Sequence, residues 1–320
     1  MKIHHVFASA RIVLLLLVAL SLLNLSISSS SADLFVSAAS RNSIIRFDDS
    51  GNLLGDFVAP GAGGLTDPQG LAFGPDGHLY VSSHTGVAGT NSVLRFNGFT
   101  GAFIDVFAIL PDMVWPAEIN FRGNLLYVSD FSAGPTGRIS RFDLNGNFVD
   151  HFATGIIGAD GQSWDANGDI LVSSFFDSTI KKYDGSTGAF LGNHVASFAG
   201  GLNGPLDNLL LPNGELLVSS FNTGSIKRFD ANGLYIDDPI TGLSGPQGLQ
   251  LGDDGSIYAG DFVTGMIHRY DANTFAFQGT FASAGNSTTN NFVFHAIPEP
   301  TSGMLFVLGL CGLVVRRRRW

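Results

Sequence analysis

Short apolar runs alternate with polar, glycine-containing segments along this chain, and one arrangement of the two occurs six times. Each copy is an apolar run, a pair of small or acidic residues, a loop, and a segment that ends on a basic, an aromatic and usually an acidic residue. The basic residue recurs about every 45 positions from Arg46 to Arg269, a period typical of solenoids and propellers. The copies are Leu34–Asp48, Leu79–Asn97, Leu126–Asp143, Leu171–Asp184, Leu217–Asp230 and Ile257–Asp271.

The pattern predicts four short strands in each repeat. The apolar run is one strand, and the alternating segment around the basic residue is the next. An Asn-Gly or Asp-Gly type of turn leads to a third strand, with examples at Leu53–Val58, Phe103–Phe107, Phe148–Phe152 and Phe277–Phe281. A fourth strand follows a loop rich in Gly and Pro, as in Pro68–Gly77 and Pro246–Gly255. Four strands in about 45 residues is the repeat of a propeller blade.

The first and last strands of the repeat region each lack a partner strand that the other can supply. Leu34–Ser37 is a strand that lacks the preceding Pro-Gln-Gly type of strand, and Asn291–Ala296 is such a strand without a successor. Pairing them closes the ring and removes two exposed sheet edges, whereas an open solenoid would need capping repeats. We therefore predict an all-β fold, a closed propeller of six four-stranded blades over residues 33–297. Seven blades are the alternative if the long second repeat has been misread.

Charge and cysteine content narrow the possible partners. Between Asp33 and Ile297 there are 11 basic and 26 acidic residues, a net charge of −15, against −10 for the whole chain. An acidic body repels phosphate backbones, so nucleic acid is not expected as a partner. The single cysteine, Cys311, lies outside the predicted propeller. The propeller therefore has no disulfide and no thiol chemistry.

Residues 1–32 have the three parts of a secretory signal peptide. Lys2 and Arg11 precede an almost wholly apolar stretch, Ile12–Ile27, and Ser30-Ser31-Ala32 supplies small residues for cleavage. Cleavage after Ala32 would begin the mature chain at Asp33. Because the apolar run is rather long, an uncleaved membrane anchor is the alternative.

Residues 298–320 combine three features in order at the C-terminus. Pro298-Glu299-Pro300 is followed by the apolar stretch Thr301–Val315 and by four arginines, Arg316, Arg317, Arg318 and Arg319. At about 1.5 Å per residue the stretch spans roughly 22 Å, short of a ~30 Å hydrocarbon core, and the arginines would keep the end of the chain in the cytoplasm. A plain tail anchor is the alternative to the family resemblance described next.

The tail resembles the PEP-CTERM sorting tail of Gram-negative-type bacteria. In that family an exosortase recognises the motif, cuts near it, and releases the mature protein or attaches it to the cell surface. The resemblance implies a secreted, surface-sorted protein with an exosortase-type processing enzyme as partner. Contact with the membrane would then be transient or through the tail alone.

The repeats resemble NHL-type repeats and the related gluconolactonase-like and streptogramin-lyase-like propellers. The shared signature is Pro-x-Gly-Leu, five further residues, then Gly-x-Leu-Tyr-Val-Ser, seen at Pro68–Ser82 and echoed from Pro246 to Gly260. The resemblance supports the fold but says little of activity, because such propellers include enzymes, binding modules and scaffolds.

The strand that starts with Pro-Gln-Gly is expected to be the innermost strand of each blade, so its first residues would lie at one mouth of the axial channel. Aligned, its second positions are Gln69, Ala117, Asp160, Leu206 and Gln247, and its third positions are Gly70, Glu118, Gly161, Asp207, Gly248 and Asn291. Glycine is the default at the third position, so Glu118 and Asp207 stand out as carboxylates that replace it. Asn120, Gln162 and Asn208 lie close by in the same strands.

Carboxylate and amide oxygens that converge on one point suit a hard cation such as Ca²⁺. The gluconolactonase-like enzymes hold a divalent metal near their axis with this class of ligand. By that resemblance Glu118, Asp207 and Asn208 are the predicted ligands of Ca²⁺ or another divalent cation, with Gln69, Asn120, Asp160, Gln162, Gln247 and Asn291 as further candidates. The alternative is that these residues only bind water and backbone at a solvated channel mouth.

Other candidate sites have simpler interpretations. Asp165–Asp169 faintly resembles a calcium loop, but its Gly comes early and Glu215 is too distant to close it, so we predict a hairpin turn. The histidines form no H-E-x-x-H pair, and no G-x-S-x-G elbow occurs. The repeated basic residue and the acid two positions on are expected to be structural, bridging neighbouring blades or a turn.

Two functions remain open from the sequence. One is a secreted binding or structural module, with a polysaccharide or protein ligand in the extracellular polysaccharide matrix; the link to the matrix comes only from the resemblance of the tail. The other is a metal-dependent hydrolase or lyase of the gluconolactonase-like or streptogramin-lyase-like type. No catalytic residue is assigned.

Overall fold

The computed structural model describes residues 32–297 apart from residues 88, 110, 135 and 286. Residues Asp33–His295 form one compact unit. Except for Ala32, the predicted signal peptide and the predicted sorting tail lie outside the described residues, so both stay predictions. Within residues 32–297, apart from those gaps, no helix is long and apolar enough to cross a membrane.

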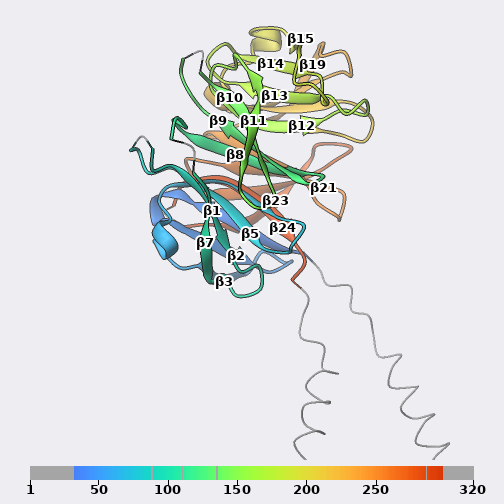
Figure 1. The fold of residues 1–320 in the computed structure, drawn as a ribbon. Helices are drawn as coiled ribbons and strands as arrows, with labels where there is room; N and C mark the ends of the chain where they lie inside the picture. The colour runs from blue at the N-terminus through green and yellow to red at the C-terminus, as the bar shows by residue number, and fades with distance from the viewer. Residues whose placement is uncertain (1–31, 88, 110, 135, 286, 298–320) are drawn as a thin grey trace, which may run out of the picture. The chain divides into compact units, whose positions relative to one another are not determined.

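The unit consists of six four-stranded antiparallel sheets, the blades of a propeller (Figure 1). From the axis outward, blade 1 contains β24 (Thr289–His295), β1 (Asp33–Ala38), β2 (Ser43–Phe47) and β3 (Leu53–Val58). Blades 2 and 3 contain β4 (Pro68–Phe73), β5 (Leu79–Ser83), β6 (Ser92–Phe96) and β7 (Phe103–Ile109), then β8 (Pro116–Arg122), β9 (Leu125–Asp130), β10 (Arg138–Asp143) and β11 (Phe148–Thr154).

Blades 4 to 6 repeat the same order. Their strands are β12 (Ala159–Trp164), β13 (Ile170–Ser174), β14 (Thr179–Tyr183) and β15 (Phe190–Val195), then β16 (Pro205–Leu210), β17 (Leu216–Ser220), β18 (Ser225–Phe229) and β19 (Tyr235–Thr241), and finally β20 (Pro246–Leu251), β21 (Ser256–Asp261), β22 (Met266–Asp271) and β23 (Phe277–Ser283). The predicted all-β propeller with six four-stranded blades is confirmed, and the alternative of seven is wrong.

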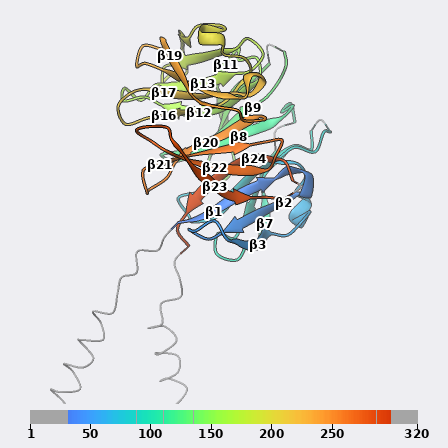
Figure 2. The ribbon, with the colours of Figure 1, turned by 180° about the vertical axis from the view of Figure 1, so that it is seen from behind.

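The ring closes through the two ends of the repeat region, as predicted. Strand β24 pairs antiparallel with β1 (Figure 1, Figure 2). In this pairing Leu34 lies opposite Phe294 and Val36 opposite Phe292. Phe292 packs in one cluster with Leu34 and Val36 of its own blade and with Tyr258 of blade 6. The core of the molecule is thus a series of apolar layers between neighbouring blades. A single blade buries too little apolar surface by itself, so each blade depends on its neighbours for stability.

Each inner strand carries a bulge near its start. In blade 2 the pairing passes from Pro68 opposite Ser83 to Leu71 opposite Val81, so that Gln69 and Gly70 together face Ser82. The same shift occurs in the other five blades. The Ser82 hydroxyl accepts the Gly70 N–H at 2.8 Å and donates to the carbonyl of Ala117 in blade 3 at 2.6 Å. In blade 2 the small residue opposite the bulge is thus its local hydrogen-bond partner.

The repeated charges are structural, as predicted, and their ion pairs lie within single blades. Arg141 forms a bidentate ion pair with Asp150 on the neighbouring strand of its own blade, at 2.9 and 2.7 Å, and Arg228 pairs with Asp237 in the same way. The acid two positions after the arginine has a different task. Asp143 accepts the N–H groups of Asn145 and Asn147 and so stabilises the turn.

The segment Asp165–Asp169 is the hairpin turn that the sequence predicts. Its first carboxylate accepts the N–H groups of Asn167 and Asp169. Lys182 lies 2.7 Å from Asp165 and 3.0 Å from Asp169. Both carboxylates are therefore occupied by turn contacts and by this ammonium group.

Candidate functional site

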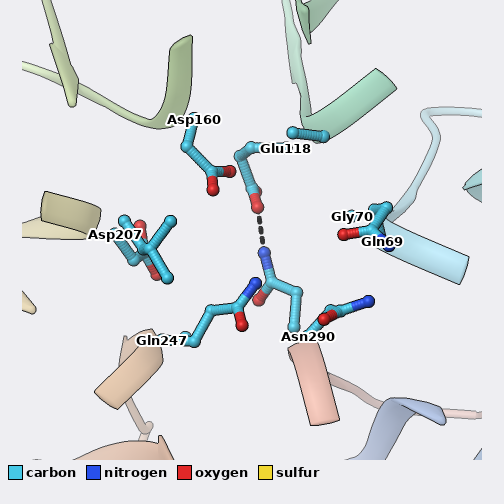
Figure 3. A pocket seen from close by; sticks show the side chains of 11 residues that line it. Gln69, Gly70, Glu118, Asp160, Asp207, Gln247 and Asn290 are labelled. Atoms are coloured by element: carbon cyan, nitrogen blue, oxygen red, sulfur yellow. Dashed lines mark hydrogen bonds between the residues drawn. The ribbon is translucent and has the colours of Figure 1, made fainter. Parts of the chain in front are cut away.

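Six inner strands surround the axis, and their bulges form its narrowest part (Figure 3). The opening there has a volume of about 10 Å³, which is room for about one water molecule or one ion. The second positions of the strands are Gln69, Ala117, Asp160, Leu206, Gln247 and Asn290, and the third positions are Gly70, Glu118, Gly161, Asp207, Gly248 and Asn291. We call this ring of residues the constriction.

Glycine and a functional side chain alternate around the third positions. Blades 1, 3 and 5 carry Asn291, Glu118 and Asp207, and the blades between them carry glycine. The reason is the close approach of neighbouring inner strands. A Cβ on Gly70 would lie 2.8 Å from the Glu118 Cα, and one on Gly161 would lie 2.6 Å from the Asp207 Cα. The backbone therefore leaves room for three side chains, arranged with approximate threefold symmetry.

Neighbouring polar groups hold the carboxylates of the constriction in place. Figure 3 shows Glu118, Asp160 and Gln247 pointing into the ring. Glu118 accepts hydrogen bonds from the side-chain amides of Asn120, at 3.2 Å, and of Asn291. Asp207 accepts the N–H groups of Asn208 and of Leu249 in blade 6, both at 2.7 Å. The side chains are thus fixed before any ligand binds.

The constriction brings three carboxyl groups together, those of Glu118, Asp160 and Asp207. Burial, followed by the charges of Asp207 and Asp160, raises the pKa of Glu118 well above its usual range. Burial and the charge of Asp207 do the same to the pKa of Asp160, and burial raises the pKa of Asp207 to about 7. No Lys or Arg among the described residues lowers any of the three pKa values. At neutral pH such a site either retains protons or attracts a cation.

The donor set suits a hard cation in its chemistry. Among the described residues no group of three or more His, Cys, Asp or Glu side chains lies close enough to hold a metal ion, so any ion here needs amide oxygens as well. Each Glu118 and Asp207 carboxylate oxygen accepts one of the hydrogen bonds named above. A carboxylate oxygen has a second lone pair, so these groups retain acceptor capacity.

The structure brings together most of the residues that the sequence singled out, but not all. Glu118, Asp207, Gln69, Asp160, Gln247 and Asn291 line the constriction. Asn208 instead lies between blades 4 and 5: its amide donates to the Gly161 carbonyl at 2.9 Å and to Ser173 Oγ at 3.0 Å, and its oxygen accepts from Ser163. Gln162 likewise donates to the Glu118 carbonyl and to Ser129 Oγ.

Beyond the constriction the channel widens towards the C-terminal ends of the inner strands. The cavity there has a volume of about 620 Å³, and we call it the funnel. Glu118, Asp207 and Asn291 lie at its floor, and its wall includes Phe73, Phe121, Trp164, Phe294 and His295.

Sequence reasoning missed the funnel and Asn290, although a signal for the funnel was present. In four inner strands an aromatic residue comes three positions after the third position: Phe73, Phe121, Trp164 and Phe294. A strand that is open to the axis at its third position also borders it farther along. The place of Asn290 in the ring follows from the register of β24. Phe294 lies opposite Leu34 just as Phe73 lies opposite Leu79, so Asn290 occupies the second position of its strand.

No family model and no curated protein matches the chain. Its fold is similar to several solved structures. A structure of a nidogen/laminin complex has a TM-score of 0.65 at 16% identity, with 83% of this chain and 98% of that chain covered. A protein assigned as a gluconolactonase has a TM-score of 0.58 at 16% identity, covering 72% and 81% of the two chains.

A catalytically inactive virginiamycin B lyase from Staphylococcus aureus, solved with quinupristin, has a TM-score of 0.50 at 16% identity and covers 73% of this chain and 71% of that one. At such identities the likeness establishes a shared six-bladed propeller fold. It does not carry an activity to this chain.

Proposed function

We propose that this protein is a binding propeller whose constriction takes a divalent cation such as Ca²⁺. One observation carries the proposal: three carboxyl groups, with raised pKa values and no basic partner among the described residues, line an opening large enough for one ion. A bound cation would offset the burial that raises these pKa values and, at Glu118 and Asp160, the repulsion by neighbouring carboxylates. Glu118 of blade 3 and Asp207 of blade 5 would supply charge and the side chain of Asn291 an amide oxygen, while Asp160 would add negative charge beside them.

Calcium titration by calorimetry, on protein freed of metal with a chelator, tests this proposal. Wild type should bind one Ca²⁺, and Glu118→Gln should lower the affinity at least about tenfold, because it keeps the shape and removes one charge. Glu215→Gln is the matched control, since Glu215 lies away from the axis and contacts Arg228 at 3.5 Å. Absence of binding to wild type, or equal effects of the two variants, would refute the proposal.

The proposed location is the surface of a Gram-negative-type bacterium. The supporting observations are the signal-peptide pattern of residues 1–32 and the Pro298-Glu299-Pro300, apolar and arginine segments of the tail. An exosortase-type enzyme is the proposed processing partner, and the polysaccharide matrix is the proposed setting. Cell fractionation of the full chain and of a variant with Arg316–Arg319 replaced by alanine tests this, because the variant should lose surface sorting.

A second candidate function is hydrolysis or elimination at the same site. The observation that favours it is the pKa of Asp207, about 7, which suits a general acid or base at neutral pH. Lactone hydrolysis and streptogramin cleavage are the reactions to assay. Asp207→Asn should then abolish turnover while Glu215→Gln retains it.

A further inference from the structure

The funnel has the dimensions of a ligand pocket. Its volume of about 620 Å³ lies within the ~300–1,000 Å³ of sites that hold small organic molecules. It ends at the constriction, whose opening of about 10 Å³ stops anything larger than water or an ion. An organic molecule that enters from the wide end therefore stops against Glu118 and Asp207.

The aromatic wall of the funnel is held rigid from behind. Each wall ring touches a buried aromatic ring of the preceding blade: Phe121 lies 4.8 Å from Tyr80, Trp164 5.5 Å from Tyr127, Phe294 4.6 Å from Tyr258 and Phe73 5.1 Å from Phe35, between ring centroids. The ring of Phe73 also stacks on His295 at 3.7 Å. Rings fixed in this way offer a flat apolar partner a surface that loses little entropy on binding.

The floor of the funnel offers acceptors. Glu118 and Asp207 supply carboxylate oxygens, and the side-chain oxygen of Gln162, which also lines the funnel, is buried without a hydrogen-bond partner among the described residues. Burial lowers the pKa of His295, so this wall residue is neutral at pH 7. No Lys or Arg is among the residues that line the funnel, so within the described residues its lining carries acceptors and no positive charge.

One wall ring already has a cation near it. The guanidinium of Arg122, an exposed residue next to the wall, lies 5.2 Å from the centroid of Trp164. Aromatic faces attract cations through their quadrupole, most strongly at Trp. Walls of this kind above an acidic floor are suited to a cation that carries an apolar body.

We propose that the funnel binds a protonated primary amine with a flat, apolar body. The ammonium group donates to Glu118, Asp207 and Gln162, and the body lies against Phe73, Phe121 and Trp164. A primary ammonium has three N–H donors, which matches three acceptor groups, whereas a quaternary ammonium has none. The ligand lies on the funnel side of the constriction.

This inference goes beyond the proposed cation site but shares Glu118 and Asp207 with it. The two sites differ at their far ends: Asp160 borders the constriction alone, and Trp164 borders the funnel alone. Asp160→Asn should thus weaken Ca²⁺ and spare the amine, whereas Trp164→Leu should weaken the amine and spare Ca²⁺. The failure of one proposal can therefore be told from the failure of the other.

Calorimetric titration of the full chain with benzylammonium, in the presence of chelator, tests the proposal. Benzyl alcohol is the neutral probe of nearly the same shape and should bind at least about tenfold more weakly. Glu118→Gln and Trp164→Leu should each weaken benzylammonium at least about tenfold. Trp115→Leu is the matched control, because Trp115 precedes the start of β8 and stacks on His84, outside the funnel lining.

Trp164→Phe shows whether the weaker binding of the leucine variant comes from a folding defect. It keeps an aromatic ring in the wall, so it should retain the affinity for benzylammonium within about threefold. Intrinsic fluorescence should change on binding in wild type and in Trp115→Leu, but not in Trp164→Phe. The proposal is overturned if benzylammonium does not bind, if benzyl alcohol binds equally well, or if Trp115→Leu weakens binding as much as Trp164→Leu does.

Discussion

The stability of the fold does not require the buried carboxyl groups at the axis. Glu118, Asp160 and Asp207 have raised pKa values, and each occupies a position where another blade of the same ring has an uncharged residue. Charges that are buried without a partner lower the stability of the folded state. Their presence at one level of the channel therefore indicates binding.

The raised pKa values of the carboxyl groups predict that the protein becomes less stable as the pH rises. Unfolded carboxyl groups titrate near pH 4, but Asp207 does so near pH 7 in the folded protein. Between these values the folded state binds more protons than the unfolded state, so the free energy of unfolding falls as pH rises. One pKa unit is about 1.4 kcal/mol, so Asp207 alone contributes on the order of a few kcal/mol.

Without divalent cations, the melting temperature should fall by about 5 °C or more from pH 5 to pH 8. Calorimetry at both pH values, with chelator and then with Ca²⁺, checks this, and Ca²⁺ should reverse most of the fall at pH 8. The lowered pKa values of His194, His268 and His295 act in the opposite direction. Asp207→Asn is therefore the control: it should flatten the pH profile, and an unchanged profile would contradict the assignment.

Alignment of the repeats identifies Glu118 and Asp207 from sequence because they replace glycine where other copies keep it. It does not predict the orientation of Asn208, the next residue after Asp207. In a regular strand neighbouring side chains alternate between faces, but the bulge directs two successive residues, such as Gln69 and Gly70, to the constriction. The position of that bulge depends on pairing with the second strand, which sequence alone does not specify.

At the scale of the element, the inner strand and the serine opposite its bulge act as one unit. Ser219 Oγ accepts the Asp207 N–H at 2.7 Å and so fixes the backbone that carries this carboxylate. The corresponding residue of blade 1, Ser37, is also fully buried, but its hydroxyl has no hydrogen-bond partner among the described residues. The serine opposite the bulge thus holds the inner strand in blade 5 but makes no such hydrogen bond in blade 1.

This difference gives a matched pair of substitutions. Ser219→Ala should lower the free energy of unfolding by about 1–3 kcal/mol, because it leaves a buried N–H unsatisfied, and should weaken Ca²⁺ as the Asp207 backbone relaxes. Ser37→Ala removes a hydroxyl that makes no such bond and should be neutral or slightly stabilising. Urea unfolding and calcium calorimetry measure both effects. Equal destabilisation by the two substitutions would rule out this role of the bulge serine.

At the scale of the whole molecule, the repeat period and the complementary ends are enough to predict six closed blades. The period counts the blades, and the unmatched strands at the two ends require one shared blade. What the fold binds does not follow in the same way. The four aromatic side chains of the funnel wall lie in different blades. They line one cavity only when the propeller is closed, so the funnel depends on tertiary structure.

Closure itself can be tested by shortening the chain. A chain that ends at Ile297 keeps β24, whereas one that ends at Thr288 lacks it, together with Asn291 of the constriction and Phe294 of the funnel. Loss of β24 leaves β1 as an uncovered edge next to the axis and exposes Leu34 and Val36, which pack with Phe292. Open apolar edges promote association between chains.

The chain ending at Ile297 should therefore remain monomeric and unfold in one transition, with a midpoint within about 2 °C of the full chain. The chain ending at Thr288 should aggregate or unfold at least about 10 °C lower, because each kcal/mol shifts a domain of this size by roughly 2–4 °C. Light scattering and calorimetry distinguish these outcomes. A synthetic peptide covering residues 289–297 should restore the transition by adding the missing strand, and an unaltered midpoint without it would show that β24 does not hold the ring closed.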